Sequence, residues 1–329
     1  MTDRTPGRTS PGVAPGRPPP RARVAVTGAT GFVGGRLVPA LAAAGYDVLA
    51  YGRRPPSAFP FVPATYRRWD LTGGPLPAVR DVDAVVHCAG TVSDWGPPAR
   101  FRSVNVAGTA AVLDTFPGAR ILHLSTASVY DPFRPHRRLR EDAPPATTYL
   151  NAYAASKAAA EALVRARRPD AIVLRPHAVY GPGDRSLLPR LLRARRWGAL
   201  PAVGTGRNLL SVTHVDNLVH ALLQALSHPR AHGAYNIADA DPVPLDALLR
   251  VVLRRLDLPP RILYLPPALA WRAGALLERI AVVRRSPQAP LLTRYIVSQL
   301  AEEYTLDLSR ARRDLEYAPR LTYLTAPLV

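Results

Sequence analysis

Tyr153 and Lys157 are the two residues whose types and spacing most clearly fit a chemical role. The sequence has 43 lysine and arginine residues, yet Lys157 is its single lysine, and it follows Tyr153 by four residues. On a helix, side chains four residues apart lie on the same face. A phenol titrates near pH ~10, and a neighbouring ammonium favours the phenolate and so lowers that pKa. Because the planar fork of an arginine does not replace a compact ammonium at a tight site, the pair predicts a tyrosine acid–base group tuned by a lysine.

Three hydroxyl side chains follow a predicted buried strand upstream of this pair. The strand covers residues 120–124, and Ser125, Thr126 and Ser128 come directly after it. Parallel sheets bind their ligands at the carboxyl ends of the strands, and a hydroxyl there can donate a hydrogen bond to a substrate oxygen. The same hydroxyls would otherwise cap a loop. Together with Tyr153 they favour a catalytic site, although this pattern alone does not single out one of them.

A glycine-rich turn near the N-terminus predicts dinucleotide binding. It follows a short apolar strand over residues 24–26 and opens a helix over about residues 33–44. Gly28 permits the tight turn, Gly31 lets the backbone approach a pyrophosphate, and Gly34 lets the helix and strand pack closely. The free N–H groups at the start of the helix then bind the phosphates.

The residues after the second predicted strand indicate which dinucleotide binds. An acidic residue at this point holds the ribose 2′-hydroxyl of NAD. The strand over residues 46–51 is followed instead by Arg53 and Arg54, which suit a 2′-phosphate. Because arginine is frequent throughout the chain, the missing acid is the stronger sign, and it favours NADP(H) over NAD(H). Further along, Asp70 and Leu71 either contact the adenine edge or form an ordinary turn.

Alternating strands and helices around these motifs predict an α/β fold. Further apolar strands are expected over residues 82–88 and 171–174, with helices over 104–115 and 153–167. This alternation is typical of a Rossmann-type, doubly wound parallel sheet. After residue 175 prolines become frequent and helical patterns dominate. The predicted organisation is a disordered Pro/Arg/Gly-rich tail, an NAD(P)-binding domain, and a smaller, mostly helical substrate lobe with some strands returning to the main sheet, over residues 1–21, 22–175 and 176–329 respectively.

Composition and charge argue against several other classes of protein. The net charge is +19, but arginine pairs are spread over the whole length without zinc-ligand spacing or an RNA-binding signature, so specific nucleic-acid binding is not expected. The single cysteine, Cys88, predicts a reducing, cytoplasmic environment, and no metal site is expected. The positive field would favour anionic substrates or an acidic carrier protein. A homodimer is compatible with the sequence.

Residues 262–283 form the most apolar long segment, but prolines and charged residues interrupt it. We therefore predict no transmembrane segment. An amphipathic helix that contacts a membrane or covers a lipophilic pocket remains open for this segment.

From about residue 23 to residue 323, the order of the motifs resembles the extended short-chain dehydrogenase/reductase superfamily. Counted back from Val129 and Tyr130, the family's catalytic Ser/Thr position falls on Thr126. Besides the glycine turn and the Tyr-x-x-x-Lys pattern, the resemblance is carried by residues 87–90, 105–109, 175–176 and 179–183.

The resemblance implies roles for particular residues. The catalytic set would be Thr126, Tyr153 and Lys157. Substrate contacts are expected from Ser93, Trp95, Ser125 and His177. Cofactor contacts are expected from Gly28, Thr30, Gly31, Phe32, Val33, Gly34, Arg53, Arg54, Asp70, Leu71, Ala89, Gly90, Thr91, Asn105, Tyr153, Lys157 and Pro176.

Within the superfamily the chain is similar to the 3β-hydroxysteroid dehydrogenase-like branch. Nucleotide-sugar epimerases typically carry Arg-Asp-Phe-x-x-Val-Asp, and the arginine and aspartate positions are Leu210 and Ser211 here. The resemblance therefore implies hydride transfer between NAD(P) and a carbonyl or secondary alcohol of a mainly apolar substrate. A nucleotide-sugar epimerase or dehydratase is the nearer alternative, and a non-catalytic NAD(P)-binding sensor is the more distant one.

Overall fold

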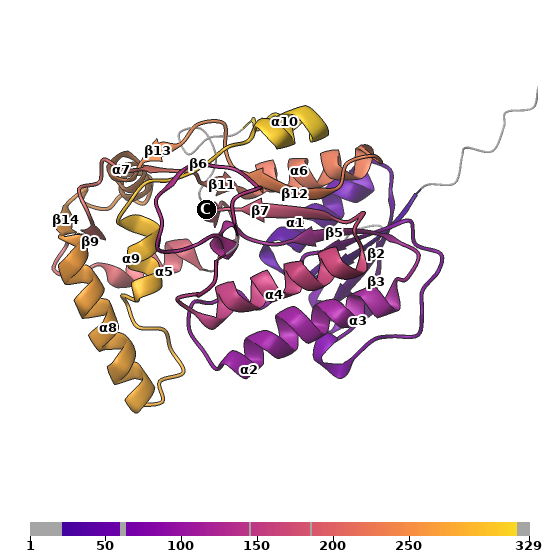
Figure 1. Ribbon diagram of the computed structural model, residues 1–329, viewed down its shortest axis with the longest axis horizontal. Helices are drawn as coiled ribbons and strands as arrows, with labels where there is room; N and C mark the ends of the chain where they lie inside the picture. Colours follow the sequence, from indigo (N-terminus) through magenta and orange to yellow (C-terminus); the bar gives the residue numbers. More distant parts are fainter. Residues whose placement is uncertain (1–21, 60–63, 145, 185, 321–329) are drawn as a thin grey trace, which may run out of the picture.

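The computed structural model describes residues 22–59, 64–144, 146–184 and 186–320. At its centre is a parallel seven-stranded sheet with strand order β12-β7-β5-β4-β1-β2-β3 (Figure 1). The order reverses between β1 and β4, as in a doubly wound sheet, so the predicted fold class is confirmed. The strands are β1 (Arg23–Thr27), β2 (Asp47–Gly52), β3 (Ala64–Arg68), β4 (Ala84–His87), β5 (Arg120–Leu124), β7 (Ile172–Pro176) and β12 (Gly233–Ile237).

Helices cover both faces of this sheet, which is why its central strands are almost entirely apolar. Leu37 of α1 packs with Val26 of β1 in the core on one face, and Val112 of α3 packs with Val85 of β4 in the core on the other. Figure 1 shows α6 on one side of the sheet and the pair α3 and α4 on the opposite side. The helices are α1 (Phe32–Ala43), α2 (Pro98–Phe101), α3 (Gly108–Thr115), α4 (Ala152–Arg167), α6 (Val215–Ser227) and α10 (Ser309–Leu315).

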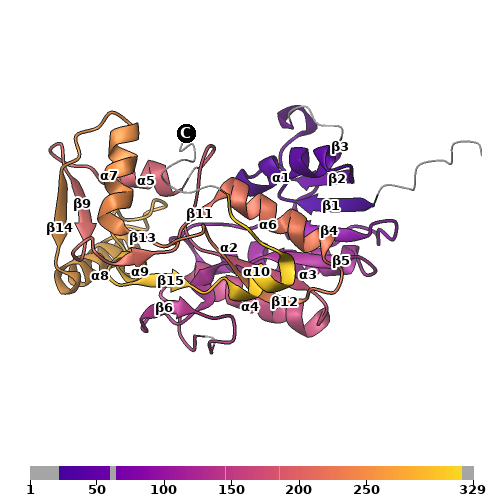
Figure 2. The same cartoon turned by 90° about the horizontal axis from the view of Figure 1, so that it is seen from above.

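A smaller lobe lies at the other end of the molecule's long axis (Figure 2). Its helices are α5 (Leu187–Ala194), α7 (Leu245–Arg255), α8 (Pro267–Val283) and α9 (Arg294–Leu300). Its strands form the pair β9 (Leu200–Val203) and β14 (Ile262–Leu265), the pair β8 (Val179–Tyr180) and β11 (Thr213–His214), and a sheet of β6 (His136–Leu139), β10 (Leu209–Leu210), β13 (Val243–Pro244) and β15 (Tyr304–Leu306).

Two strands cross the predicted division at residue 175. β12 comes from the second half of the chain and pairs with β7 at the edge of the main sheet. In the opposite direction, β6 comes from the first half and pairs with β15 in the lobe. The division into two domains stays a prediction, but the crossing strands tie the lobe firmly to the sheet.

The apolar segment singled out in the sequence becomes β14 and α8. Within the described ranges, no helix is both long and apolar enough to cross a membrane. α8 follows the outer edge of the lobe (Figure 1), where Leu276 and Val283 are 59% and 83% exposed.

Candidate active site

The glycine turn between β1 and α1 has the shape that a pyrophosphate needs. Gly28 has φ +72°, and a Cβ there would lie 2.7 Å from the main-chain nitrogen of Ala89. A Cβ on Gly34 would lie 2.2 Å from the carbonyl oxygen of Gly28, so only glycine lets α1 approach the turn this closely. α1 begins at Phe32, and no described side chain caps its first N–H groups. Such open N–H groups bind phosphates, so this cradle fits a dinucleotide.

The end of β2 lies beside this turn. A Cβ on Gly52 would lie 3.0 Å from Oγ1 of Thr30 and 2.9 Å from the hydroxyl of Tyr66. Arg53 and Arg54 follow directly and are exposed. The structure therefore brings Thr30 and the two arginines to one edge of the cradle, where a cofactor ribose would lie.

Asp70 has the turn role that the sequence left open. Its carboxylate accepts hydrogen bonds from the main-chain nitrogen of Thr72 at 3.0 Å and from its Oγ1 at 2.8 Å. These bonds cap a short 3₁₀ helix over Leu71–Gly73 and lower the pKa of Asp70. The side chain of Leu71 is buried against Gly108. A direct adenine contact by the Leu71 side chain is therefore not supported.

Asn105 connects the loop after β4 to α4. It is buried on the π-helical turn Arg102–Ala107, a feature that is frequent at functional sites. Its Oδ1 accepts from the main-chain nitrogen of Thr91 at 2.8 Å, and its Nδ2 donates to Oγ of Ser156 at 2.9 Å. Ser156 in turn donates to the carbonyl oxygen of Tyr153 at 2.8 Å. Through these bonds Asn105 positions the loop and the helix, and its direct contact with a cofactor stays a prediction.

The three predicted catalytic residues lie together at the carboxyl end of β5. Asn151 caps α4 by accepting a hydrogen bond from a main-chain N–H, so Tyr153 stands in the first turn of this helix. The hydroxyl of Tyr153 is hydrogen-bonded to the side chain of Thr126. One turn later, Lys157 donates from Nζ to the carbonyl oxygen of Leu124 at 2.5 Å.

The pKa values of this group differ from the expectation. Burial raises the pKa of Tyr153, and the hydrogen bond with Thr126 offsets this only in part. The expected lowering of the Tyr153 pKa by Lys157 is not seen, and the Lys157 ammonium donates to the carbonyl of Leu124. Burial lowers the pKa of Lys157 to about 8, against the opposing charge of Glu161. Tyr153 is therefore a protonated donor at neutral pH, which is the form that a general acid needs.

Ser125 and Thr126 point to opposite sides of the chain. Thr126 is extended, with φ −158° and ψ 151°, and successive side chains of extended backbone alternate in direction. Ser125 donates to Oε2 of Glu161 at 2.9 Å, deep in the protein. Glu161 also forms a buried ion pair with Arg175, which donates to the hydroxyl of Tyr130 at 2.9 Å. This arrangement does not support the predicted substrate contact of Ser125.

His177 is also held inside the protein, directly after Pro176 at the end of β7. Its ring stacks on Tyr304 at 4.0 Å between centroids and with 6° between planes. Its Nδ1 lies 2.5 Å from the carbonyl oxygen of Ser211, and its Nε2 lies 3.1 Å from Oε1 of Gln299. Both ring nitrogens thus have protein partners, so a substrate contact by His177 is not supported.

Ser93 and Trp95 shape the loop that follows β4. Ser93 donates to the carbonyl oxygen of Trp95 at 2.9 Å, and the indole nitrogen of Trp95 donates to the carbonyl oxygen of Ser286 at 3.0 Å. The loop is thereby fixed against the segment after α8. Contact of either residue with a substrate stays a prediction.

The lobe adds residues that sequence reasoning missed. Tyr295 of α9 has its hydroxyl 2.7 Å from Oγ of Ser128, and Thr126 Oγ1 donates to the same Oγ at 3.1 Å. Asp94 forms an ion pair with Arg190 of α5 and accepts from Oγ1 of Thr293 at 2.8 Å. No motif marks Tyr295, which lies more than a hundred residues after the site it joins, and only the fold brings them together.

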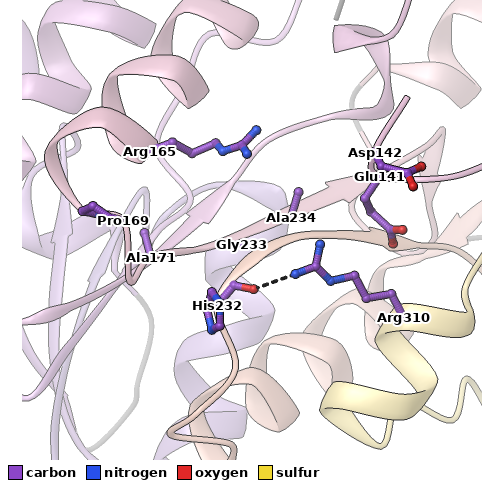
Figure 3. Close-up of a pocket in the computed structure, with 9 residues that line it drawn as sticks. All are labelled: Glu141, Asp142, Arg165, Pro169, Ala171, His232, Gly233, Ala234 and Arg310. Atoms are coloured by element: carbon purple, nitrogen blue, oxygen red, sulfur yellow. Dashed lines mark hydrogen bonds between the residues drawn. The ribbon is translucent and has the colours of Figure 1, made fainter. Parts of the chain in front are cut away.

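A separate surface cavity lies near the opposite, amino ends of β7 and β12. Figure 3 shows it between Ala171, Gly233 and Arg310, where Arg310 donates to the carbonyl oxygen of His232 at 3.1 Å. It contains none of the predicted site residues. Since parallel sheets bind their ligands at the carboxyl ends, this cavity is distinct from the candidate active site.

The chain belongs to the NAD dependent epimerase/dehydratase family, whose model matches residues 24–238. It is 33% identical to a 2-alkyl-3-oxoalkanoate reductase of Stenotrophomonas maltophilia, covering 91% of this chain and 96% of that protein. It is 32% identical to 4-hydroxy-2-methyl-3-oxo-4-farnesyl-3,4-dihydroquinoline-1-oxide ketoreductase of Stigmatella aurantiaca, covering 92% and 93% of the two chains. It is also 32% identical to a human sterol-4-alpha-carboxylate 3-dehydrogenase, decarboxylating, covering 71% of this chain and 67% of that protein.

Among solved structures, the fold resembles MoeE5 in complex with UDP-glucose and NAD. The TM-score is 0.68 and the identity 26%, with 93% of this chain and 97% of that one covered. Together, the family and the reductase and dehydrogenase relatives make this chain an NAD(P)-dependent short-chain dehydrogenase/reductase that acts on carbonyl or alcohol groups. The resemblance inferred from the sequence is thereby confirmed, and the epimerase alternative is only weakly supported.

Proposed function

We propose that this protein is an NADP(H)-dependent ketone reductase for a mainly apolar substrate, with Tyr153 as its proton donor. The observation that carries the proposal is the grouping of Tyr153, Thr126 and Lys157 at the carboxyl end of β5, next to the phosphate cradle. The names of the relatives support a 3-oxo acid or a related ketone as the substrate.

The chain's own residues account for the proton and for the charge. When bound, the nicotinamide coenzyme supplies the hydride or takes it up. Thr126 holds the substrate oxygen by a hydrogen bond, and Tyr153 gives that oxygen its proton as negative charge develops there. Lys157 places a positive charge one helical turn from Tyr153 and would hold the cofactor ribose when the coenzyme is bound.

Two residue positions in the lobe argue against activity on nucleotide sugars. The position where such enzymes carry an arginine is Leu210, which is buried on β10. Its neighbour Ser211 is also buried, and its Oγ accepts from the main-chain nitrogen of Leu306 at 3.0 Å. No cationic side chain can therefore grip a diphosphate from these two positions.

Preference for NADP(H) rests on Arg53 and Arg54, which are exposed just beyond β2 and can pair with a 2′-phosphate.

We further propose a cytoplasmic location, based on the lone reduced cysteine, and retain a homodimer as an expectation. An acidic carrier that delivers the substrate would be drawn by the net charge of +19. In that case substrate affinity would fall steeply with ionic strength, and an affinity unchanged by salt would remove the carrier.

The direct test is a coenzyme assay with purified protein. NADPH oxidation at 340 nm is measured with a 2-alkyl-3-oxoalkanoate ester and, in parallel, interconversion of UDP-glucose and UDP-galactose is measured with NAD. We expect stoichiometric oxidation of NADPH and formation of the 3-hydroxy ester. Epimerisation without net change of coenzyme would overturn the proposal in favour of nucleotide-sugar chemistry.

A further inference from the structure

A second pair of hydroxyls stands directly beside the proposed proton donor. Ser128 lies on the short 3₁₀ helix over Ala127–Val129, and Tyr295 comes from the first turn of α9. Their oxygens are 2.7 Å apart, and Oγ of Ser128 is 3.1 Å from Oγ1 of Thr126. Tyr153 is close enough to Tyr295 to raise the pKa of its phenol.

The protons in this chain of hydroxyls leave one donor free. Thr126 donates to Oγ of Ser128 as long as no substrate oxygen takes that proton. Ser128 and Tyr295 together carry two hydroxyl protons but share one hydrogen bond, in which either oxygen can be the donor. One of these two protons therefore has no acceptor among the described residues, although the pair lies beside the proposed catalytic group.

Tyr295 is held rigidly and stays protonated. Thr293 caps α9 and donates to Asp94, which is itself paired with Arg190, so the first turn of α9 is fixed to the loop after β4. Burial raises the pKa of Tyr295, and the neighbouring Tyr153 raises it further. A fixed, neutral pair of hydroxyls with one proton left over is suited to donate to a ligand oxygen.

The spacing indicates what that oxygen is. In the proposed mechanism the reacting oxygen is held by Thr126 and Tyr153. Oγ of Ser128 lies 3.1 Å from Oγ1 of Thr126. Two oxygens carried by alternate carbon atoms lie about this far apart when both point the same way. On the basis of the proposed function, we infer that Ser128 and Tyr295 bind a second substrate oxygen in 1,3 relation to the reacting carbonyl, so that the enzyme selects 3-oxoacyl compounds over simple ketones.

The test compares two substrates of equal chain length, a 3-oxo ester and a ketone without the ester oxygen. Tyr295→Phe keeps the ring and removes only the hydroxyl. We expect kcat/KM for the 3-oxo ester to fall roughly tenfold, the value of one neutral hydrogen bond, and kcat/KM for the simple ketone to change less than twofold. Ser128→Ala should act in the same direction. The free 3-oxo acid forms a third arm, which distinguishes recognition of a carboxylate from recognition of an acyl carbonyl.

Tyr264→Phe is the matched control, because the Tyr264 hydroxyl donates to Asp246 in the lobe, at 2.8 Å and away from the site. It should leave the ratio between the two substrates unchanged. An equal loss on both substrates in Tyr295→Phe would overturn the inference, since Tyr295 would then only support the fold of the site.

A binding measurement separates this inference from the proposed function. Calorimetry with the 3-hydroxy ester and with the matched simple alcohol requires no turnover. We expect Tyr295→Phe to weaken binding of the hydroxy ester roughly tenfold and to leave binding of the alcohol nearly unchanged. Equal affinities of the parental protein for the two ligands would reject the inference, even if the protein reduces ketones. Selective binding of the hydroxy ester without any NADPH oxidation would uphold the inference and reject the proposed reductase activity.

Discussion

Lys157 donates a hydrogen bond from Nζ to the carbonyl oxygen of Leu124, the last residue of β5. This contact joins α4 to the strand end that carries Thr126. The lysine side chain is 6% exposed, and burial lowers its pKa to about 8. The ammonium of the chain's single lysine is thus held in one place, and it loses its proton within the pH range of ordinary assays.

Replacement of Lys157 by methionine removes this charge and keeps the stem. We expect kcat/KM to fall at least ~10²-fold, because the substrate oxygen and Tyr153 lose a nearby cation, and we expect weaker coenzyme binding as well. Lys157→Arg should not restore activity, since the planar guanidinium does not fit the geometry of the ammonium. Coenzyme fluorescence and steady-state kinetics measure both effects. An active arginine variant would contradict this role.

The pH dependence of reduction should report Lys157. Above pH about 8 the folded protein loses the ammonium, while the raised pKa of Tyr153 keeps the phenol protonated, so kcat/KM should fall on the alkaline side of about 8. In the unfolded chain the lysine retains its proton to its ordinary pKa near ~10.4. The unfolded state therefore binds more protons between these values, and this residue's contribution to stability rises with pH there. A kcat/KM that stays constant to pH 10 would exclude Lys157 as the titrating group.

Glu161 connects the stability of the core with this titration. Its carboxylate is paired with the buried Arg175, and its charge raises the pKa of Lys157. Glu161→Gln leaves Arg175 without its counter-charge and should lower the free energy of unfolding by about 3–5 kcal/mol. It should also move the alkaline limb of the activity profile to lower pH. The double variant Glu161→Gln, Arg175→Met should recover much of the stability and keep the shifted limb. A limb that does not move would disprove the link to Lys157.

The cofactor preference is tested at the end of β2. Replacing both Arg53 and Arg54 by alanine should weaken NADPH binding roughly tenfold and leave NADH binding nearly unchanged, because only NADPH carries the 2′-phosphate. Arg137→Ala, on β6 and away from the cradle, is a control for the loss of positive charge. An equal loss of affinity for NADPH and NADH would show that the two arginines do not bind the 2′-phosphate.

The sequence predicted those parts of the site that depend on short segments. The glycine turn, the helical spacing of Tyr153 and Lys157, and the hydroxyls after β5 each lie within a few residues, so local geometry determines them. Side-chain direction was harder to predict. Ser125 was expected at the substrate, but it alternates with Thr126 and bonds Glu161 instead.

Residues supplied from a distance had no sequence signal. Tyr295 reaches Ser128 only because α9 folds back onto the loop after β5, and the Asp94–Arg190 pair joins two elements that no motif connects. His177 follows a recognised motif, yet stacking on Tyr304 keeps it inside the protein. These contacts depend on how the lobe packs against the sheet, which neither periodicity nor motif spacing encodes.

The measurement that tests the central claim most directly is the activity of Tyr153→Phe with NADPH and a ketone substrate. The phenylalanine keeps the ring and the packing of α4 and removes the proton donor. We predict that the rate of NADPH oxidation at 340 nm falls at least ~10²-fold while NADPH binds with nearly parental affinity. Near-parental turnover in this variant would contradict the assignment of Tyr153 as the general acid.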